Sequence, residues 1–166
     1  MNNRRVVRRM GPALFAREVE GEADASKLRI TVVCARWNPT VTDALLSSAL
    51  GALAECGAKP GNVVVVRVPG AFELPAASRL ALASKTCDAV VALGAIVRGE
   101  TTHHEVLGSA VGAALASISA ETGRPIGFGL LTCETMEQAR ARTGKGAEAA
   151  EAAVEMANLR RRMRAR

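Results

Sequence analysis

The residues best suited to chemistry gather in one short stretch, from Gly94 to Glu105. It holds both histidines of the chain, His103 and His104, directly after a pair of threonines. An imidazole titrates near neutral pH and suits proton transfer, and hydroxyl and N–H groups at the start of a helix bind anions. Successive helix residues point about 100° apart, so only one of the two histidines is expected to face a given ligand. The stretch therefore predicts an anion site beside a proton-transferring side chain.

Two residues of this stretch leave alternatives open. Taken by itself, a histidine at a helix start is best interpreted as a solvated side chain that has no catalytic part, and only the threonines and helix N-terminus beside His103 favour a catalytic one. Arg98 either binds a phosphate group or forms an ion pair with Glu100 or Glu105. The residue types alone do not decide between these interpretations.

The flanking sequence indicates that the stretch is a strand-to-helix loop. Residues 88–93 form an apolar run typical of a buried strand, and apolar residues recur at helical spacing over 104–121. Thr102 and Glu105 have the spacing of a capping box at the start of that helix. In open α/β sheets ligands bind outside the carboxyl ends of strands, where this loop is expected.

The rest of the chain repeats the same strand-and-helix alternation. We expect further strands at 28–35, 62–68 and 126–131, and further helices at 39–56, 73–84, 145–162 and, briefly, from Thr135. Asn38 is expected to cap the helix that begins at Pro39, and Gly57 and Gly123 to end two helices. Continuous apolar strands that alternate with helices predict a three-layer αβα sandwich, with a flavodoxin-like four-stranded parallel sheet and helices on both faces.

The loops after the other strands also carry unusual residues. Trp37, the only tryptophan, follows the first strand, and it either packs as a hydrophobic staple on the next helix or stacks on a planar ligand. Phe72 and Glu73 follow the second strand, and the carboxylate either complements the helix dipole or accepts hydrogen bonds from ligand hydroxyls. Convergence of these loops at one sheet edge predicts a binding site there.

Composition and charge set the remaining limits. The chain has 166 residues, the length of one domain, and its formal charge of +6 is concentrated at the two ends. Arginines cluster there at positions 4, 5, 8, 9, 160, 161, 162, 164 and 166. We expect residues 1–26 to form a basic, poorly ordered arm, and 27–166 one domain with a basic C-terminal tail. These ends are expected to be solvated and frayed; contact with phosphates or with the cargo of an assembly is the alternative.

Several classes of protein are not favoured. The chain lacks the apolar segment of a secretory signal or a membrane span, so we expect a cytoplasmic protein without membrane contact. Its four cysteines are scattered and are expected to be free thiols, mostly buried, with no metal site. A P-loop and a complete G-x-G-x-x-G are both missing, so a nucleotide cofactor is not expected.

The loop residues and several further motifs resemble the 6,7-dimethyl-8-ribityllumazine synthase family. The similarity runs from about residue 28 to 159, with all motifs in the family's order. These motifs are Ala35-Arg36-Trp37-Asn38, Pro69-Gly70-Ala71-Phe72-Glu73-Leu74-Pro75, Ala92 to His103, Phe128 to Thr132, Glu137-Gln138-Ala139 and Glu155 to Leu159. Together they identify the chain as a member of the family.

The resemblance implies a transferase of riboflavin biosynthesis that needs no cofactor or metal. It would condense 5-amino-6-(D-ribitylamino)uracil with 3,4-dihydroxy-2-butanone 4-phosphate. In the family's pattern His103 transfers protons, and Glu100, Thr101 and Arg142 bind the butanone phosphate. The pyrimidine and its ribityl chain would be held by Trp37, Ala71, Phe72, Glu73, Ala95, Ile96, Val97 and Phe128.

The resemblance also implies an assembly. Phe128 and Arg142 match residues that the family supplies from the adjacent subunit, so at least a pentamer is expected, with riboflavin synthase as a further partner and nucleic acid disfavoured. The loop between Arg142 and Lys145 is several residues shorter than is common in the family, so a closed shell is not implied. Other functions left open are an archaeal-type riboflavin synthase, a non-catalytic flavin or lumazine carrier, and a nucleic-acid-binding shell that uses the arginine-rich ends.

Overall fold

The computed structural model describes residues 17–165 and confirms the predicted sheet of four parallel strands. The strands are β1 (Ile30–Ala35), β2 (Val63–Val68), β3 (Ala89–Val97) and β4 (Ile126–Cys133), in the order β2-β1-β3-β4. The register places Ile30 beside Val63 and Ala89, and Val90 beside Ile126. All four carboxyl ends therefore reach the same edge of the sheet.

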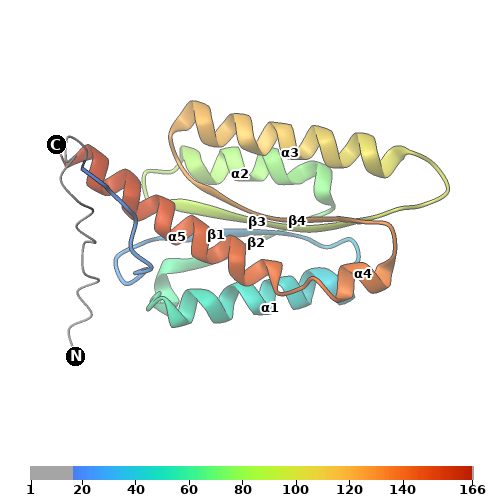
Figure 1. Cartoon of the computed structure of the whole chain (residues 1–166), viewed down its shortest axis with the longest axis horizontal. Coiled ribbons are helices and arrows are strands. Elements are labelled where there is room, and N and C mark those ends of the chain that lie inside the picture. The colour runs from blue at the N-terminus through green and yellow to red at the C-terminus, as the bar shows by residue number, and fades with distance from the viewer. Residues whose placement is uncertain (1–16, 166) are drawn as a thin grey trace, which may run out of the picture.

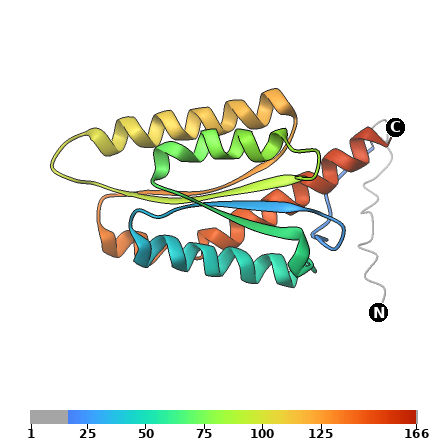
Figure 2. The same ribbon diagram turned by 180° about the vertical axis from the view of Figure 1, so that it is seen from behind.

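Helices cover both faces of this sheet (Figure 1). One layer holds α1 (Pro39–Glu55), α4 (Met136–Arg140) and α5 (Lys145–Arg164), and the other holds α2 (Leu74–Ala83) and α3 (His103–Thr122). Two short 3₁₀ turns, η1 (Pro60–Asn62) and η2 (Ala71–Glu73), flank β2. The reverse view shows the same two layers (Figure 2). The structure is thus the flavodoxin-like sandwich that the sequence predicts.

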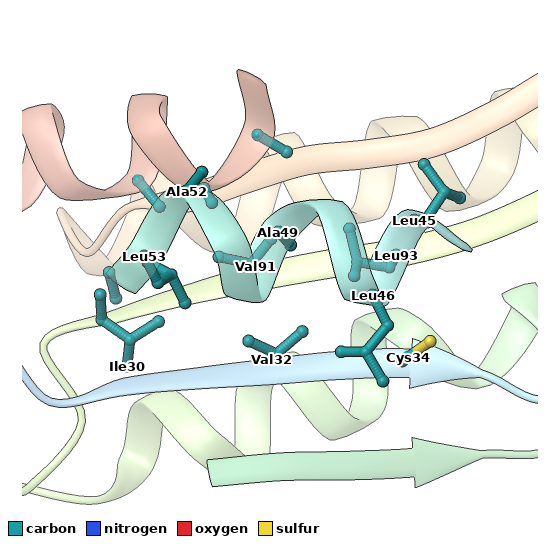
Figure 3. Packing of buried hydrophobic residues seen from close by; sticks show 14 of the residues in the cluster. Ile30, Val32, Cys34, Leu45, Leu46, Ala49, Ala52, Leu53, Val91 and Leu93 are labelled. Carbon is teal, nitrogen blue, oxygen red and sulfur yellow. The ribbon is translucent and has the colours of Figure 1, made fainter. Parts of the chain in front are cut away.

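Alternate residues of each central strand supply the two hydrophobic cores. Ile30, Val32 and Cys34 of β1 point toward α1 and α5, where they meet side chains such as Leu45 and Leu53 (Figure 3). The residues between them face α2 and α3. This burial on both faces explains why β1 and β3 are almost purely apolar.

The edge strand β2 departs from that expectation. The middle of β2 is not covered by helices, and Val64 has 56% of its surface exposed. Both faces of the sheet are therefore covered at its centre but not at this edge.

Several element boundaries differ from those predicted. β3 continues to Val97 and β4 to Cys133, because the two strands pair as far as this residue pair. The predicted loop thus begins at Arg98 rather than Gly94. Thr102 precedes α3 without a side-chain cap bond, so the predicted capping box is not formed. Gly57 and Gly123 end their helices with positive φ, as predicted.

The two ends of the chain are only partly described. Arg4, Arg5, Arg8, Arg9 and Arg166 lie outside the described residues, as does most of the predicted N-terminal arm. The part from residue 17 onward runs beside the end of α5, where Asn158 donates hydrogen bonds to the carbonyls of Glu22 and Asp24. Arg161 pairs with Asp88, and Arg162 with Glu22. The expected frayed tail is therefore helical as far as Arg164.

Candidate functional site

A pocket of about 380 Å³ lies at the carboxyl edge of the sheet, among the loops that follow β1, β2 and β3. It is lined by Trp37, Asn38, Gly70, Ala71, Phe72, Glu73, Ala95, Ile96, Val97, Gly99, Thr101, His103, His104 and Leu107. Most of the residues singled out in the sequence therefore meet in one cavity. Glu100, Phe128 and Arg142 are the exceptions, since they do not line it.

Trp37 is an exposed residue of the pocket lining. Its side chain is 72% exposed, so it is not buried against α1 as a hydrophobic staple would be. Its backbone N–H donates to the carbonyl of Pro69 at 3.2 Å, and the neighbouring Arg36 N–H donates to Val68 at 2.8 Å. These two bonds tie the loop after β1 to the loop after β2. An exposed aromatic ring on a fixed backbone is suited to stacking on a planar ligand.

The carboxylate of Glu73 is held by its own turn. One oxygen accepts a hydrogen bond from the backbone N–H of Gly70 at 2.8 Å, across η2. Phe72, between them, is 70% exposed and lines the same pocket. This hydrogen bond closes the η2 turn and fixes the orientation of the Glu73 carboxylate in the pocket.

The last residues of β3 form one wall of the pocket. Ala95 pairs with Leu131 of β4, and Val97 with Cys133, so this wall is regular strand. Ala95 and Ile96 are buried. Such a wall offers apolar side chains with little freedom to move, which suits the flat face or edge of a ring.

The loop between β3 and α3 carries the polar end of the site. The hydroxyl of Thr101 accepts a hydrogen bond from the backbone N–H of His103 at 3.4 Å. This is a local turn contact just before α3, which has no side-chain cap bond. His103 is exposed at the start of α3, beside free N–H groups of the helix terminus. An anion and a titratable imidazole can meet there.

His104 differs from its neighbour in being buried, with only 6% of its surface exposed. Its Nδ1 lies 3.2 Å from the carbonyl oxygen of Thr101, which accepts the bond, so this ring nitrogen carries a proton. Its Nε2 lies 4.0 Å from a carboxylate oxygen of Glu134. Both histidines line the pocket. Their surroundings differ, since His104 turns inward beneath the loop while His103 stays at its surface. That only one of them faces a given ligand stays a prediction.

Arg98 does not form the ion pair with Glu100 or Glu105 that was one of its two expected contacts. A guanidinium nitrogen of Arg98 lies 2.7 Å from a carboxylate oxygen of Glu134, just after β4, so the ion pair is with Glu134 rather than with Glu100 or Glu105. This hydrogen bond lowers the pKa of the Glu134 carboxyl below its ordinary value. The pair joins the loop after β3 to the loop after β4.

Two predicted residues lie apart from the pocket. Phe128, on β4, is 54% exposed beside α3, where its ring approaches Gly112. Arg142 is exposed in the turn after α4, and its guanidinium donates to the carbonyl of Gln138 at 3.0 Å. Glu100 is exposed next to the pocket residue Gly99. Within one chain, then, neither Phe128 nor Arg142 reaches the site.

Sequence reasoning missed several lining residues, chiefly Asn38, His104 and Leu107. Asn38 was interpreted as the helix N-cap, but its side chain makes no cap bond and instead donates to the carbonyl of Ala95 at 2.9 Å. Its position at a strand end, beside Trp37, was the available signal. Leu107 could have been found from helical spacing, since it lies one turn after His103.

The described residues hold no group of histidine, cysteine, aspartate or glutamate side chains that could bind a metal ion. All four cysteines are free thiols, as predicted, and Cys56 alone is only half-buried. Burial raises the pKa of the Cys34 thiol, so it stays protonated at neutral pH. Over residues 17–165 we find no helix with the length and apolar character of a membrane span.

Comparison with known proteins places residues 27–161 under the family model described as 6,7-dimethyl-8-ribityllumazine synthase. A 6,7-dimethyl-8-ribityllumazine synthase of Kocuria rhizophila is 52% identical over 142 residues, which are 81% of this chain and 88% of the relative. Those of Desulfotalea psychrophila and Kosmotoga olearia are 44% and 43% identical, over 85% and 90% of this chain and 94% and 99% of their own. The matched region includes every residue of the pocket.

Proposed function

This chain belongs to the 6,7-dimethyl-8-ribityllumazine synthase family, and we propose the part that each pocket residue plays in its reaction. The enzyme is a transferase of riboflavin biosynthesis. It condenses 5-amino-6-(D-ribitylamino)uracil with 3,4-dihydroxy-2-butanone 4-phosphate to give 6,7-dimethyl-8-ribityllumazine, phosphate and water. One observation carries the assignment of the site: an exposed tryptophan, a fixed carboxylate and an exposed imidazole meet in one cavity within the matched region.

The pyrimidine substrate occupies the end of the pocket between Trp37 and β3. Its ring stacks on the exposed indole, and its edge lies along Ala95, Ile96 and Val97. The ribityl chain runs toward η2, where Ala71 and Phe72 flank it and the Glu73 carboxylate accepts hydrogen bonds from its hydroxyls. The fixed direction of this carboxylate supports the proposal, because it is set before the substrate binds.

The butanone phosphate lies at the other end, beside the start of α3. Glu100 and Thr101 line it, and its phosphate approaches the N-terminus of the helix, where free N–H groups favour an anion. A guanidinium, Arg142, is suited to hold the phosphate through two parallel hydrogen bonds. With both substrates bound, the amine of the pyrimidine faces the ketone carbon.

The chemical steps require proton transfers, and none of them requires a covalent bond between a substrate and the enzyme. Attack of the amine on the ketone, with loss of water, gives a Schiff base; phosphate then leaves, and ring closure with loss of a second water gives the lumazine. His103 is the side chain placed to take up and return protons in these steps, since it is exposed in the pocket at a helix start. Holding two substrates together supplies much of the remaining acceleration.

The complete site forms between subunits of a homo-oligomer, with a pentamer as the smallest expected form. Phe128 and Arg142 are exposed and do not line their own chain's pocket, which supports their use by a neighbouring copy. Trp37, Phe72 and the uncovered β2 are also exposed, as expected of surfaces that a second subunit covers. A cytoplasmic location and a partnership with riboflavin synthase stay predictions from the sequence.

The assignment is tested by mixing the purified protein with both substrates and following the absorbance of the lumazine. We expect product only when both are present. Lumazine supplied alone should give no riboflavin, which separates this activity from that of a riboflavin synthase. Binding of the pyrimidine without any product would contradict the assignment and favour a carrier.

A further inference from the structure

Asn38 has an unusual backbone at the mouth of the pocket. Its φ and ψ are both 58°, and it is the only residue other than glycine with positive φ among residues 17–165. Side chains disfavour this left-handed conformation, although asparagine tolerates it better than most. Glycine would adopt it more readily. The backbone alone therefore does not account for an asparagine here.

The backbone and the side chain of Asn38 form hydrogen bonds with different elements. The carbonyl of Asn38 accepts hydrogen bonds from Val41 and Thr42, each at 3.0 Å, and so starts α1. The side-chain amide instead donates to the carbonyl of Ala95 on β3, at 2.9 Å. One residue thus joins the start of α1 to the wall of the pocket.

This hydrogen bond replaces a missing strand partner. The pairing of β1 with β3 ends at Cys34 and Leu93, and Ala95 lies beyond it. Ala95 is only 4% exposed, so without the amide its carbonyl would face a buried edge with no strand beside it. A buried carbonyl that loses its donor is costly. The amide of Asn38 is therefore the group that holds β3 to the loop after β1 at this point.

We propose that Asn38 is a positioning residue, whose hydrogen bond to Ala95 sets the distance between the stacking ring of Trp37 and the β3 wall of the pyrimidine subsite. Trp37 is joined to Asn38 by one peptide bond, and its own N–H is fixed to Pro69. Arg36 and Asn38, the residues before and after Trp37 in the chain, are also hydrogen-bonded to neighbouring segments. The inference rests on the proposed function for the identity of the ligand. The hydrogen bond itself is a feature of the structure and does not depend on that function.

The test compares Asn38→Gly with Asn62→Gly. Glycine at position 38 tolerates the left-handed backbone and removes the side chain with its amide. The second variant makes the same change in η1, before the amino end of β2. We expect Asn38→Gly to raise the KM for the pyrimidine about 10-fold, the worth of one buried hydrogen bond, with the KM for the butanone phosphate nearly unchanged. Asn38→Asp, which sets a carboxylate against the carbonyl, should do at least as much harm. Asn62→Gly should match the wild type.

Trp37 also supplies a readout that needs no substrate, because it is the only tryptophan of the chain. In Asn38→Gly its fluorescence should be quenched more readily by acrylamide and show lower anisotropy. Circular dichroism should stay near that of Asn62→Gly, while the urea midpoint should be lower, because the buried carbonyl of Ala95 loses its donor. Normal product formation by the wild type with an unchanged pyrimidine KM in Asn38→Gly would overturn the inference and leave the proposed function intact. If the wild type made no lumazine, the proposed function would fail, and unchanged Trp37 quenching and anisotropy in Asn38→Gly would overturn the inference independently.

Discussion

At the scale of single residues, the two adjacent histidines are separated by their surroundings rather than by their chemistry. His104 is buried, and its Nδ1–H is held by the carbonyl of Thr101, whereas His103 is exposed in the pocket. A side chain that exchanges protons with a substrate must reach it, and a buried ring with a fixed proton is suited to hold a loop instead. This difference supports His103 as the residue that moves protons.

Replacing His103 by alanine should slow turnover without abolishing it. We expect kcat to fall roughly 100-fold, a typical worth of one general acid or base, because substrate positioning stays intact. The pyrimidine should still quench Trp37 with an affinity close to that of the wild type. Unchanged kcat in this variant would remove His103 from the mechanism, and loss of pyrimidine binding would show a structural part instead.

At the scale of elements, the sequence was most informative where local pattern decides the structure. Helical spacing and apolar runs predicted each strand and helix, because these patterns follow from backbone geometry. The ends of β3 and β4 were predicted too early, since their extension depends on pairing with each other across a long stretch of chain. The side-chain hydrogen bond of Asn38 also involves a distant group, the carbonyl of Ala95, which no local pattern reveals.

The close packing of α5 on the sheet is another long-range feature, and it depends on glycines. A Cβ atom added at Gly127 of β4 would overlap the carbonyl oxygen of Ala149 in α5. At Gly51, on the exposed side of α1, an added Cβ would meet nothing. The two positions therefore form a matched pair for the same substitution.

Gly127→Ala should lower the free energy of unfolding by about 2 kcal/mol or more, because a helix backbone has to move. Gly51→Ala should raise it by about 0.5–1 kcal/mol through better helix propensity. Urea denaturation followed by circular dichroism measures both. Equal effects of the two substitutions would mean that α5 does not rest directly on β4.

At the scale of the whole molecule, the residues proposed for the site lie in two separate places on one chain. The pocket with Trp37 and His103 opens among the loops after β1, β2 and β3, while Arg142 lies in the turn after α4 and outside it. The basic end of α5 lies at the opposite end of the molecule from the loop between β3 and α3 (Figure 1), so its arginines cannot take the place of Arg142. This arrangement agrees with the proposal that Arg142 serves the pocket of a second copy of the chain.

Mixed oligomers of two impaired variants distinguish a shared site from one within a single chain. His103→Ala lacks the proton-transferring group and Arg142→Ala the phosphate-binding one, so each alone should be slow. If the site combines His103 of one subunit with Arg142 of the next, co-refolding equal amounts should restore about a quarter of the sites, since each of the two subunits must independently be of the right kind. Activity should then rise well above the mean of the two variants. If both residues served the site of their own chain, every site would keep one lesion, and the mixture would show only that mean.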